Sequence, residues 1–215
     1  MKEFITALAL ATSCVSVAAA PREAAPFGFK EARQQFMACL SGDGKTCEAA
    51  IEKFNALAAG HPGHPLLAAY AGAGTAILGR DAYMPWNKLK YAEDGADAVE
   101  KALAQLTPAH DEALFHGTPE SVETRMLAAT TLLSLPDFMN RSASGKRALE
   151  AALKSSVFGQ AAPPVRARLL ALAARTAKAE QRGDDEAAYL KQIVALAPQA
   201  PEAARASSRL KELGL

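Results

Sequence analysis

The stretch over residues 50–72, AIEKFNALAAGHPGHPLLAAYAG, decides the expected fold. Ala50, Phe54 and Leu57 fall at i, i+4 and i+7, the spacing of one face of an amphipathic helix. Pro62 lies in the turn that follows and ends that helix, because proline lacks the backbone N–H that a helix interior needs. A second helix begins directly after the turn. The stretch therefore predicts two helices joined by a tight connection.

The second helix, expected over 66–78, is unusually rich in alanine and glycine. Each glycine inside a helix costs roughly 1 kcal/mol relative to alanine. Gly72 and Gly74 therefore require a compensating reason, and the expected one is close approach of a neighbouring helix.

The residues Ala50, Phe54, Leu57 and Pro62 resemble the tetratricopeptide repeat, which has a small residue, an aromatic, a small or apolar residue and a proline at these spacings. Gly72 falls where the next repeat has glycine or alanine. The resemblance is close over one and a half repeats, loose elsewhere and poor over 109–165. It implies antiparallel helix pairs stacked into a short α-solenoid around a continuous core, and a binding role without catalysis. Partial matches recur at Ala96, Leu103 and Pro108, and at Gly183, Ala188 and Ala195.

Composition and periodicity predict an all-α protein of about nine helices. Half of the residues are apolar and only 6% are aromatic, which suits helices packed closely on small side chains. Strand-like alternation is absent from the sequence. Asp94-Gly95 is expected to kink or restart the fourth helix, and Thr118 is expected to cap the fifth, with Pro119 at its first position. The expected helices cover 28–41, 46–60, 66–79, 85–106, 118–135, 142–153, 163–182 (the longest), 184–196 and 201–213.

The first twenty residues have the pattern of a secretory signal peptide. Lys2 precedes seventeen uncharged residues, 4–20, which end in an alanine-rich segment. We therefore expect an exported, periplasmic protein with a signal at 1–20, a short segment at 21–27 and a tetratricopeptide-like helical domain at 28–215. Two alternatives stay open, a membrane anchor through 4–20 and lipidation at Cys14. No other stretch is long and apolar enough to span a membrane.

The net charge of +1 does not favour nucleic-acid binding. Charge is nevertheless uneven, because 81–137 holds ten acidic and four basic residues whereas 141–182 holds nine basic and two acidic. Four bases form a stripe on one face of the 163–182 helix: Arg168, Arg175, Lys178 and Arg182. This stripe is interpreted as a solvated face, with an anion-binding surface or attraction to the acidic third as alternatives.

Cys39 and Cys47 flank a short loop between the first two expected helices. An antiparallel hairpin would bring them together, and in an oxidising compartment the two cysteines predict a structural disulfide, with free thiols as the alternative.

The segment over 80–91 departs from the repeat pattern and looks like an insertion. It holds the only tryptophan, and its aromatic rings and lysines suit a binding lip for a polar or anionic partner. The alternative is that Trp86 and Tyr91 fill a gap beside the glycine-rich helix. The candidate binding residues, with one tyrosine from the preceding helix, are Tyr70, Tyr83, Trp86, Lys88, Lys90 and Tyr91.

No catalytic, cofactor or metal motif is complete. Gly44-Lys45-Thr46 resembles the end of a phosphate-binding loop, but the first glycine of that motif and its preceding strand are missing. His61 and His64 are interpreted as solvent-exposed turn residues. The polar cluster of His110, Asp111, Glu112 and His116 has no nucleophile or metal-ligand spacing beside it.

These patterns predict an exported helical-repeat scaffold that binds a protein or peptide in the cell envelope, as an accessory to an assembly or transport complex. The alternative is a small-molecule or lipid carrier with a cavity between small-residue helices. An enzyme is the least favoured class, and we expect no cofactor. The sequence does not predict the partner's identity or an oligomeric state.

Overall fold

The computed structural model describes residues 22–215, except 43 and 197. The predicted signal peptide, the alternative anchor and Cys14 lie outside the described residues. The described chain is mainly α-helical, as expected. It has nine helices of 11 residues or more and one short helix, α5: α1 (Phe29–Cys39), α2 (Gly44–Gly60), α3 (Pro65–Asp81), α4 (Pro85–Ala104), α5 (Ala109–Glu112), α6 (Glu120–Ser134), α7 (Ser142–Leu153), α8 (Pro163–Ala179), α9 (Gly183–Leu196) and α10 (Pro201–Glu212).

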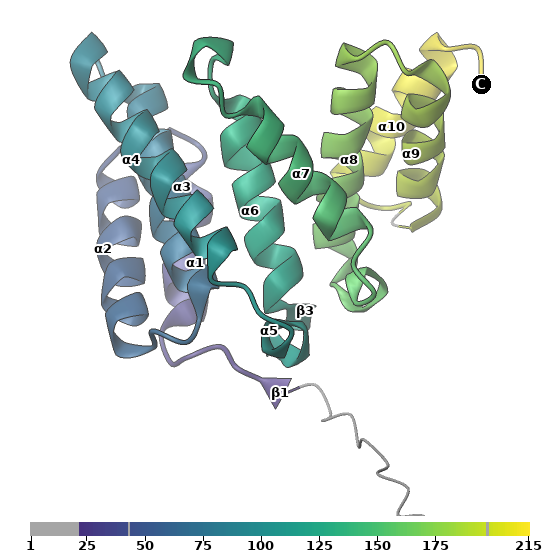
Figure 1. The fold of residues 1–215 in the computed structure, drawn as a ribbon. Helices are drawn as coiled ribbons and strands as arrows, with labels where there is room; N and C mark the ends of the chain where they lie inside the picture. Colours follow the sequence, from purple (N-terminus) through teal and green to yellow (C-terminus); the bar gives the residue numbers. More distant parts are fainter. Residues whose placement is uncertain (1–21, 43, 197) are drawn as a thin grey trace, which may run out of the picture.

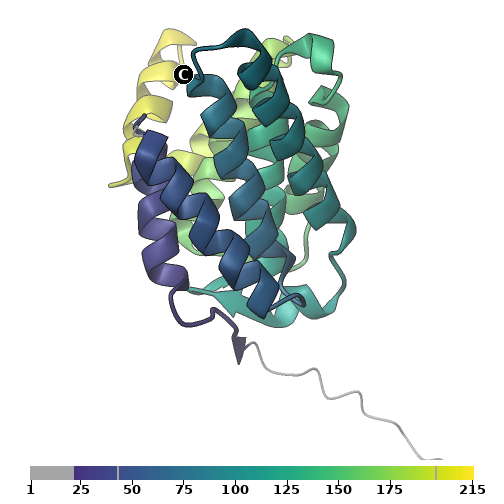
Figure 2. The same cartoon turned by 90° about the vertical axis from the view of Figure 1, so that its left-hand side faces the viewer.

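Helices that follow one another in sequence pack against one another in space. The pairs α1–α2, α3–α4, α6–α7 and α8–α9 are in contact, and α10 packs on α9. In Figure 1 the colours pass from purple at one side to yellow at the other, so the chain progresses in one direction (Figure 1). Viewed from the α2 side, the later helices lie behind the first ones (Figure 2). Helix α6 contacts both α3 and α4 and thereby joins the first four helices to the rest.

Glycines allow α3 and α4 to approach closely. A Cβ atom placed on Gly95 would lie 2.6 Å from the Ala76 nitrogen and 2.7 Å from the Gly72 oxygen. One placed on Gly72 would lie 2.7 Å from the Ala98 Cβ. The packing reason expected for Gly72 is therefore present. The expected restart at Gly95 is wrong, because α4 is continuous over 20 residues and the glycine lies where α4 meets α3.

Several boundaries also differ from those expected. The segment 80–91 is not an insertion, since α3 extends to Asp81 and α4 begins at Pro85. Helix α4, not α8, is the longest, because α8 ends at Ala179. Among the described helices, none is long and apolar enough to cross a membrane.

A small three-stranded sheet closes the end of the molecule where the described chain begins. Strand β1 (Arg22–Glu23) pairs in parallel with β2 (Ala113–Phe115), which pairs antiparallel with β3 (Thr118–Pro119). The segment 107–117, which lies between two of the expected helices, contains α5 and β2, and α6 starts at Glu120, not at Pro119. Thr118 does not cap α6; its hydroxyl accepts a hydrogen bond of 3.2 Å from the Ala162 backbone.

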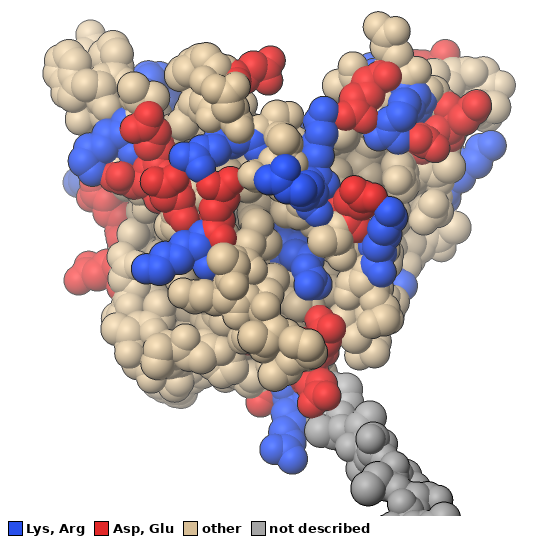
Figure 3. All heavy atoms as spheres, in the orientation of Figure 1, with Lys and Arg blue, Asp and Glu red and all other residues tan. Residues whose placement is uncertain are grey.

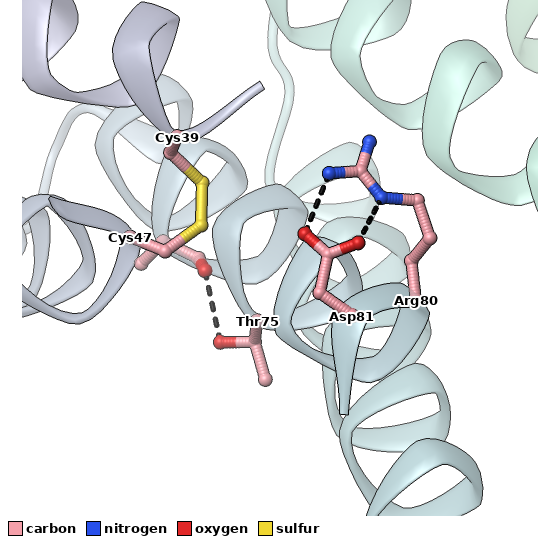
Figure 4. The surroundings of a disulfide bond; sticks show 6 residues. Cys39, Cys47, Thr75, Arg80 and Asp81 are labelled. Atoms are coloured by element: carbon pink, nitrogen blue, oxygen red, sulfur yellow. Dashed lines mark hydrogen bonds and ion pairs between the residues drawn. A yellow bond between two sulfur atoms is a disulfide. The ribbon is translucent and has the colours of Figure 1, made fainter. Parts of the chain in front are cut away.

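The predicted disulfide is confirmed. Cys39 at the end of α1 and Cys47 in the first turns of α2 are bonded, with Cα atoms 4.5 Å apart (Figure 4). Both residues are buried. The bond ties the first helix pair together beside the C-terminal end of α3, where Arg80 and Asp81 form a two-point ion pair at 2.6 Å (Figure 4).

The core of the first half is built on aromatic rings. Phe54 stacks on Tyr70 with ring centroids 4.5 Å apart. Phe29 meets Phe115 edge-on at 5.0 Å, and Phe36 meets Tyr70 edge-on at the same distance. These contacts join α1, α2, α3 and β2, and they place the Tyr70 side chain at the bottom of the groove described next.

Candidate functional site

An apolar groove of about 930 Å³ lies in the described part of the chain. Helix α1 supplies Phe36 and Met37, Leu40 directly follows α1, and α3 supplies the small side chains of Ala73 and Ala76. The first turns of α4, the C-terminal half of α6 and the 3₁₀ helix η1 (Asp137–Met139) complete the walls. The remaining lining residues are Tyr70, Ile77, Gly79, Arg80, Pro85, Lys88, Leu89, Ala92, Met126, Leu127, Thr130, Thr131, Ser134, Leu135, Pro136, Phe138, Met139 and Arg168.

Methionine is concentrated at this groove. Outside Met1 the chain has four methionines. Met37, Met126 and Met139 line the groove, and Met84 directly precedes α4, whose first turns form one wall. Methionine is unbranched and polarisable, so a methionine-lined surface adapts its shape to apolar ligands.

Large apolar side chains are also exposed around the groove. Phe138 in η1 is 72% exposed, and Leu40 and Leu89 are each 42% exposed. Tyr83, in the α3–α4 turn, is 88% exposed. In Figure 3 the α3–α4 turn and η1 form two largely uncharged projections at the upper left, with a hollow between them (Figure 3). A groove with apolar walls and an exposed apolar rim is typical of a binding site.

The structure places the six predicted binding residues in different environments. Tyr70 and Lys88 line the groove, whereas Tyr83 and Trp86 are exposed beside it. Lys90 is directed to Asp94, at 2.5 Å, and is not part of the groove.

The gap-filling interpretation of Trp86 is wrong, because its side chain is 67% exposed. Tyr91 is partly buried, and its Cβ would be 3.2 Å from a Cβ placed on Gly79, so this ring packs beside the α3–α4 crossing. Its neighbour Lys90 lies 5.9 Å from the ring centroid.

A buried polar cluster lies beneath the groove. Arg33 Nε donates to the Tyr70 hydroxyl at 3.0 Å and lies 3.4 Å from Glu123 Oε1. The Tyr70 hydroxyl in turn donates to Glu123. Burial raises the pKa of Glu123, although the hydrogen bond from Tyr70 and the charge of Arg33 oppose that shift. Burial, followed by the adjacent Glu123, raises the pKa of Tyr70 well above its usual value.

A second buried carboxylate, Glu120, stands one turn earlier on α6. Its side chain is fully buried, and Oε2 lies 2.9 Å from His64 Nδ1. Its other oxygen accepts a hydrogen bond of 3.2 Å from the Leu66 backbone, at the start of α3. The prediction that His64 is only a solvent-exposed turn residue is therefore wrong, because its ring is a hydrogen-bond partner of the buried Glu120 side chain. His61 is exposed, as expected.

Sequence reasoning missed both buried glutamates. Glu120 and Glu123 are three residues apart on α6 and lie on the helix surface that faces α3. The available signal was that Glu123 directly follows the apolar Val122 in the helix expected over 118–135. Its partners come from distant helices and could not be identified from spacing.

The other predicted polar groups have structural roles. His110 Nε2 lies 3.1 Å from the Gly63 oxygen, which links α5 to the α2–α3 turn. Asp111 accepts a hydrogen bond from Ser121. No group of three or more His, Cys, Asp or Glu residues able to hold a metal occurs among the residues the structure describes.

The basic stripe on α8 divides between two environments. Arg168 lines the groove and lies 4.0 Å from Glu202, whereas Arg182 pairs with Glu180 and Asp185 at the helix end. The acidic and basic thirds meet elsewhere, because Arg141 pairs with Asp97 and Glu100 of α4.

Comparison with known proteins provides no relative. The chain matches no protein-family model, and neither a curated protein nor a solved structure is significantly similar to it. The resemblance to the tetratricopeptide repeat stays a prediction.

Proposed function

We propose that this chain is an exported, tetratricopeptide-like helical scaffold that binds an amphipathic segment of a protein partner in the cell envelope. The observation that carries the proposal is the methionine-lined apolar groove between α1, α3, α4 and α6. An amphipathic helix that lays its apolar face into such a groove is a common form of peptide recognition.

Two features favour a peptide over a rigid small molecule. The walls include three methionines, which can repack around different apolar side chains. The exposed Phe138 and Leu89 extend the apolar surface beyond the groove itself, where a segment longer than the cavity would contact them. Hydroxyl groups of Thr130, Thr131 and Ser134 on one wall offer polar contacts along the same path.

A carrier of an apolar small molecule is the second candidate. Its support is the cavity itself, because about 930 Å³ lies within the 300–1,000 Å³ typical of small-molecule pockets and the lining is mainly apolar. Both candidate functions use the same groove. They differ in the ligand that the groove binds, which is a peptide for the scaffold and a small apolar molecule for the carrier.

A direct binding experiment separates them. Trp86 is the only tryptophan, so its emission reports events beside the groove without labelling. The probes are a synthetic amphipathic helical peptide with one leucine face, a scrambled peptide of the same composition and a fluorescent fatty acid. Thr130→Phe fills the groove from an exposed position, and Gln192→Phe makes the same kind of change at an exposed site on α9.

The proposal expects the amphipathic peptide to bind more tightly than the scrambled one. Thr130→Phe should weaken its binding about tenfold, which corresponds to about 1.4 kcal/mol, and Gln192→Phe should leave it unchanged. Equal affinity of both peptides, or no effect of Thr130→Phe, would contradict a peptide groove. Binding of the fatty acid alone, lost in Thr130→Phe, would establish the carrier instead.

A further inference from the structure

A second, smaller pocket of about 400 Å³ lies along the outer part of α1. Its walls are Lys30, Arg33, Gln34 and Met37 of α1 and His116 from the turn between β2 and β3. Two of the five residues are cationic, one is an amide, one is a histidine, and none is a carboxylate. This composition differs from that of the groove, whose walls are mainly apolar.

Arg33 is held in place from behind. Its Nε atom is directed inward to the Tyr70 hydroxyl and to Glu123, at 3.0 and 3.4 Å. Its two terminal nitrogens form no hydrogen bond with any described residue, although the side chain is one-third exposed. A guanidinium fixed along one edge, with its remaining N–H groups free, is preorganised for a planar or tetrahedral oxyanion.

The opposite wall is also fixed. His116 has a left-handed backbone with φ of 50°, and its backbone N–H donates to Glu23 at 3.1 Å. Its ring lies 5.5 Å from the Phe29 ring, centroid to centroid. Lys30 is exposed and forms no ion pair with the rest of the described chain, so its charge is available to a ligand.

The carboxylates near this pocket are already engaged. Glu123 lies behind Arg33 and accepts from Tyr70, and Glu23 is bonded to the His116 backbone. Glu31, next to Lys30 in sequence, pairs with Lys53 at 2.5 Å. No internal acid therefore occupies the side of the pocket that Lys30 and Arg33 share.

We infer that this pocket binds an oxyanion, either a carboxylate or a phosphate group. The two terminal nitrogens of Arg33 donate hydrogen bonds to the oxyanion, and Lys30 provides a second positive charge. The Gln34 amide and the His116 ring border the site. Met37 lines both this pocket and the apolar groove, so a molecule with a charged end in the pocket could extend an apolar part into the groove. The other form of ligand is a free ion. The site itself does not depend on the function proposed for the groove.

Isothermal titration of the full chain with inorganic phosphate, acetate and octanoate tests this inference. The test variants are Lys30→Gln, which changes an exposed residue, and His116→Asn, because asparagine tolerates the left-handed backbone. Lys45→Gln makes the same charge change at an exposed position on α2 and serves as the control. Thermal melting of each variant establishes that it is folded.

We expect Lys30→Gln to weaken binding of the preferred anion about fivefold and Lys45→Gln to leave it unchanged. If octanoate binds much more tightly than acetate, the oxyanion of the ligand is the charged end of an apolar molecule. If phosphate binds more tightly than either carboxylate, the ligand is a free phosphate ion or a phosphorylated molecule. The inference is overturned if none of the three anions binds, or if Lys30→Gln and Lys45→Gln have the same effect.

Discussion

Replacing Gly95 with alanine tests the close packing of α4 against α3. In an isolated helix this change would stabilise by roughly 1 kcal/mol, because alanine is the better helix former. In this structure the new Cβ would lie 2.6 Å from the Ala76 nitrogen and 2.7 Å from the Gly72 oxygen, which are backbone atoms of α3 and cannot rotate away. Helices α3 and α4 would have to separate. Overpacking typically costs about 1–3 kcal/mol, and the upper end applies here because the clash is with backbone atoms. Subtracting the gain of about 1 kcal/mol leaves an expected net loss of about 2 kcal/mol.

The matched control is Gly60→Ala. Gly60 is also helical, at the end of α2, and a Cβ there meets no atom within 4 Å. The two variants should be compared by urea unfolding at pH 7 with the disulfide intact. We expect Gly60→Ala to be as stable as the wild type or slightly more stable, whereas Gly95→Ala unfolds at lower urea concentration. A Gly95→Ala protein as stable as the control would refute the close α3–α4 contact and the explanation of the glycines.

Three further predictions concern the buried polar cluster and the disulfide. Tyr70→Phe keeps the ring but removes the hydroxyl that donates to Glu123 and accepts from Arg33, so urea unfolding should show a loss of about 2 kcal/mol; an unchanged midpoint would mean that the cluster adds no stability. Because the folded pKa of Glu123 is raised, the folded state holds its proton when the unfolded chain has lost it, and stability falls as pH rises from about 4.5 towards the folded pKa. The stability of Glu123→Gln relative to the wild type should therefore improve from pH 4.5 to pH 7 in thermal melts, and a constant difference would contradict the raised pKa. A Cys39→Ser/Cys47→Ser protein should be about 2–3 kcal/mol less stable than the wild type in urea unfolding. Reduced wild type is the control: if it is as unstable as the variant, the loss comes from the missing bond and not from the serines.

Much of the helical architecture could be predicted because its signals are local. Pro65, Pro85, Pro163 and Pro201 each begin a helix, since a proline fits the first turn, where its missing N–H costs nothing. The disulfide was predictable for a related reason: the cysteines stand eight residues apart, at facing ends of two helices joined by a short loop.

The candidate sites were only partly predictable. Tyr70 was expected at a binding surface and does line the groove, but its hydroxyl is committed to Arg33 and Glu123, which are 37 and 53 residues away. Trp86 was expected either to bind a partner or to fill a gap in the packing, and it is exposed. In both cases the residue type was evident from the sequence, but whether the side chain is buried could not be predicted, because burial depends on which helix lies opposite.

The sequence by itself determined that the chain forms helices, where most of them begin and end, and which two cysteines can bond. These properties depend on residues within a few positions of one another, through backbone hydrogen bonding, proline geometry and the 3.6-residue period. The tertiary structure alone decided that Glu120 and Glu123 are buried, that α4 packs closely on α3 at Gly95, and that a groove opens between α1, α3, α4 and α6. Those outcomes depend on how helices distant in sequence pack, and a cavity is the space that this packing leaves, which no local pattern of residues encodes.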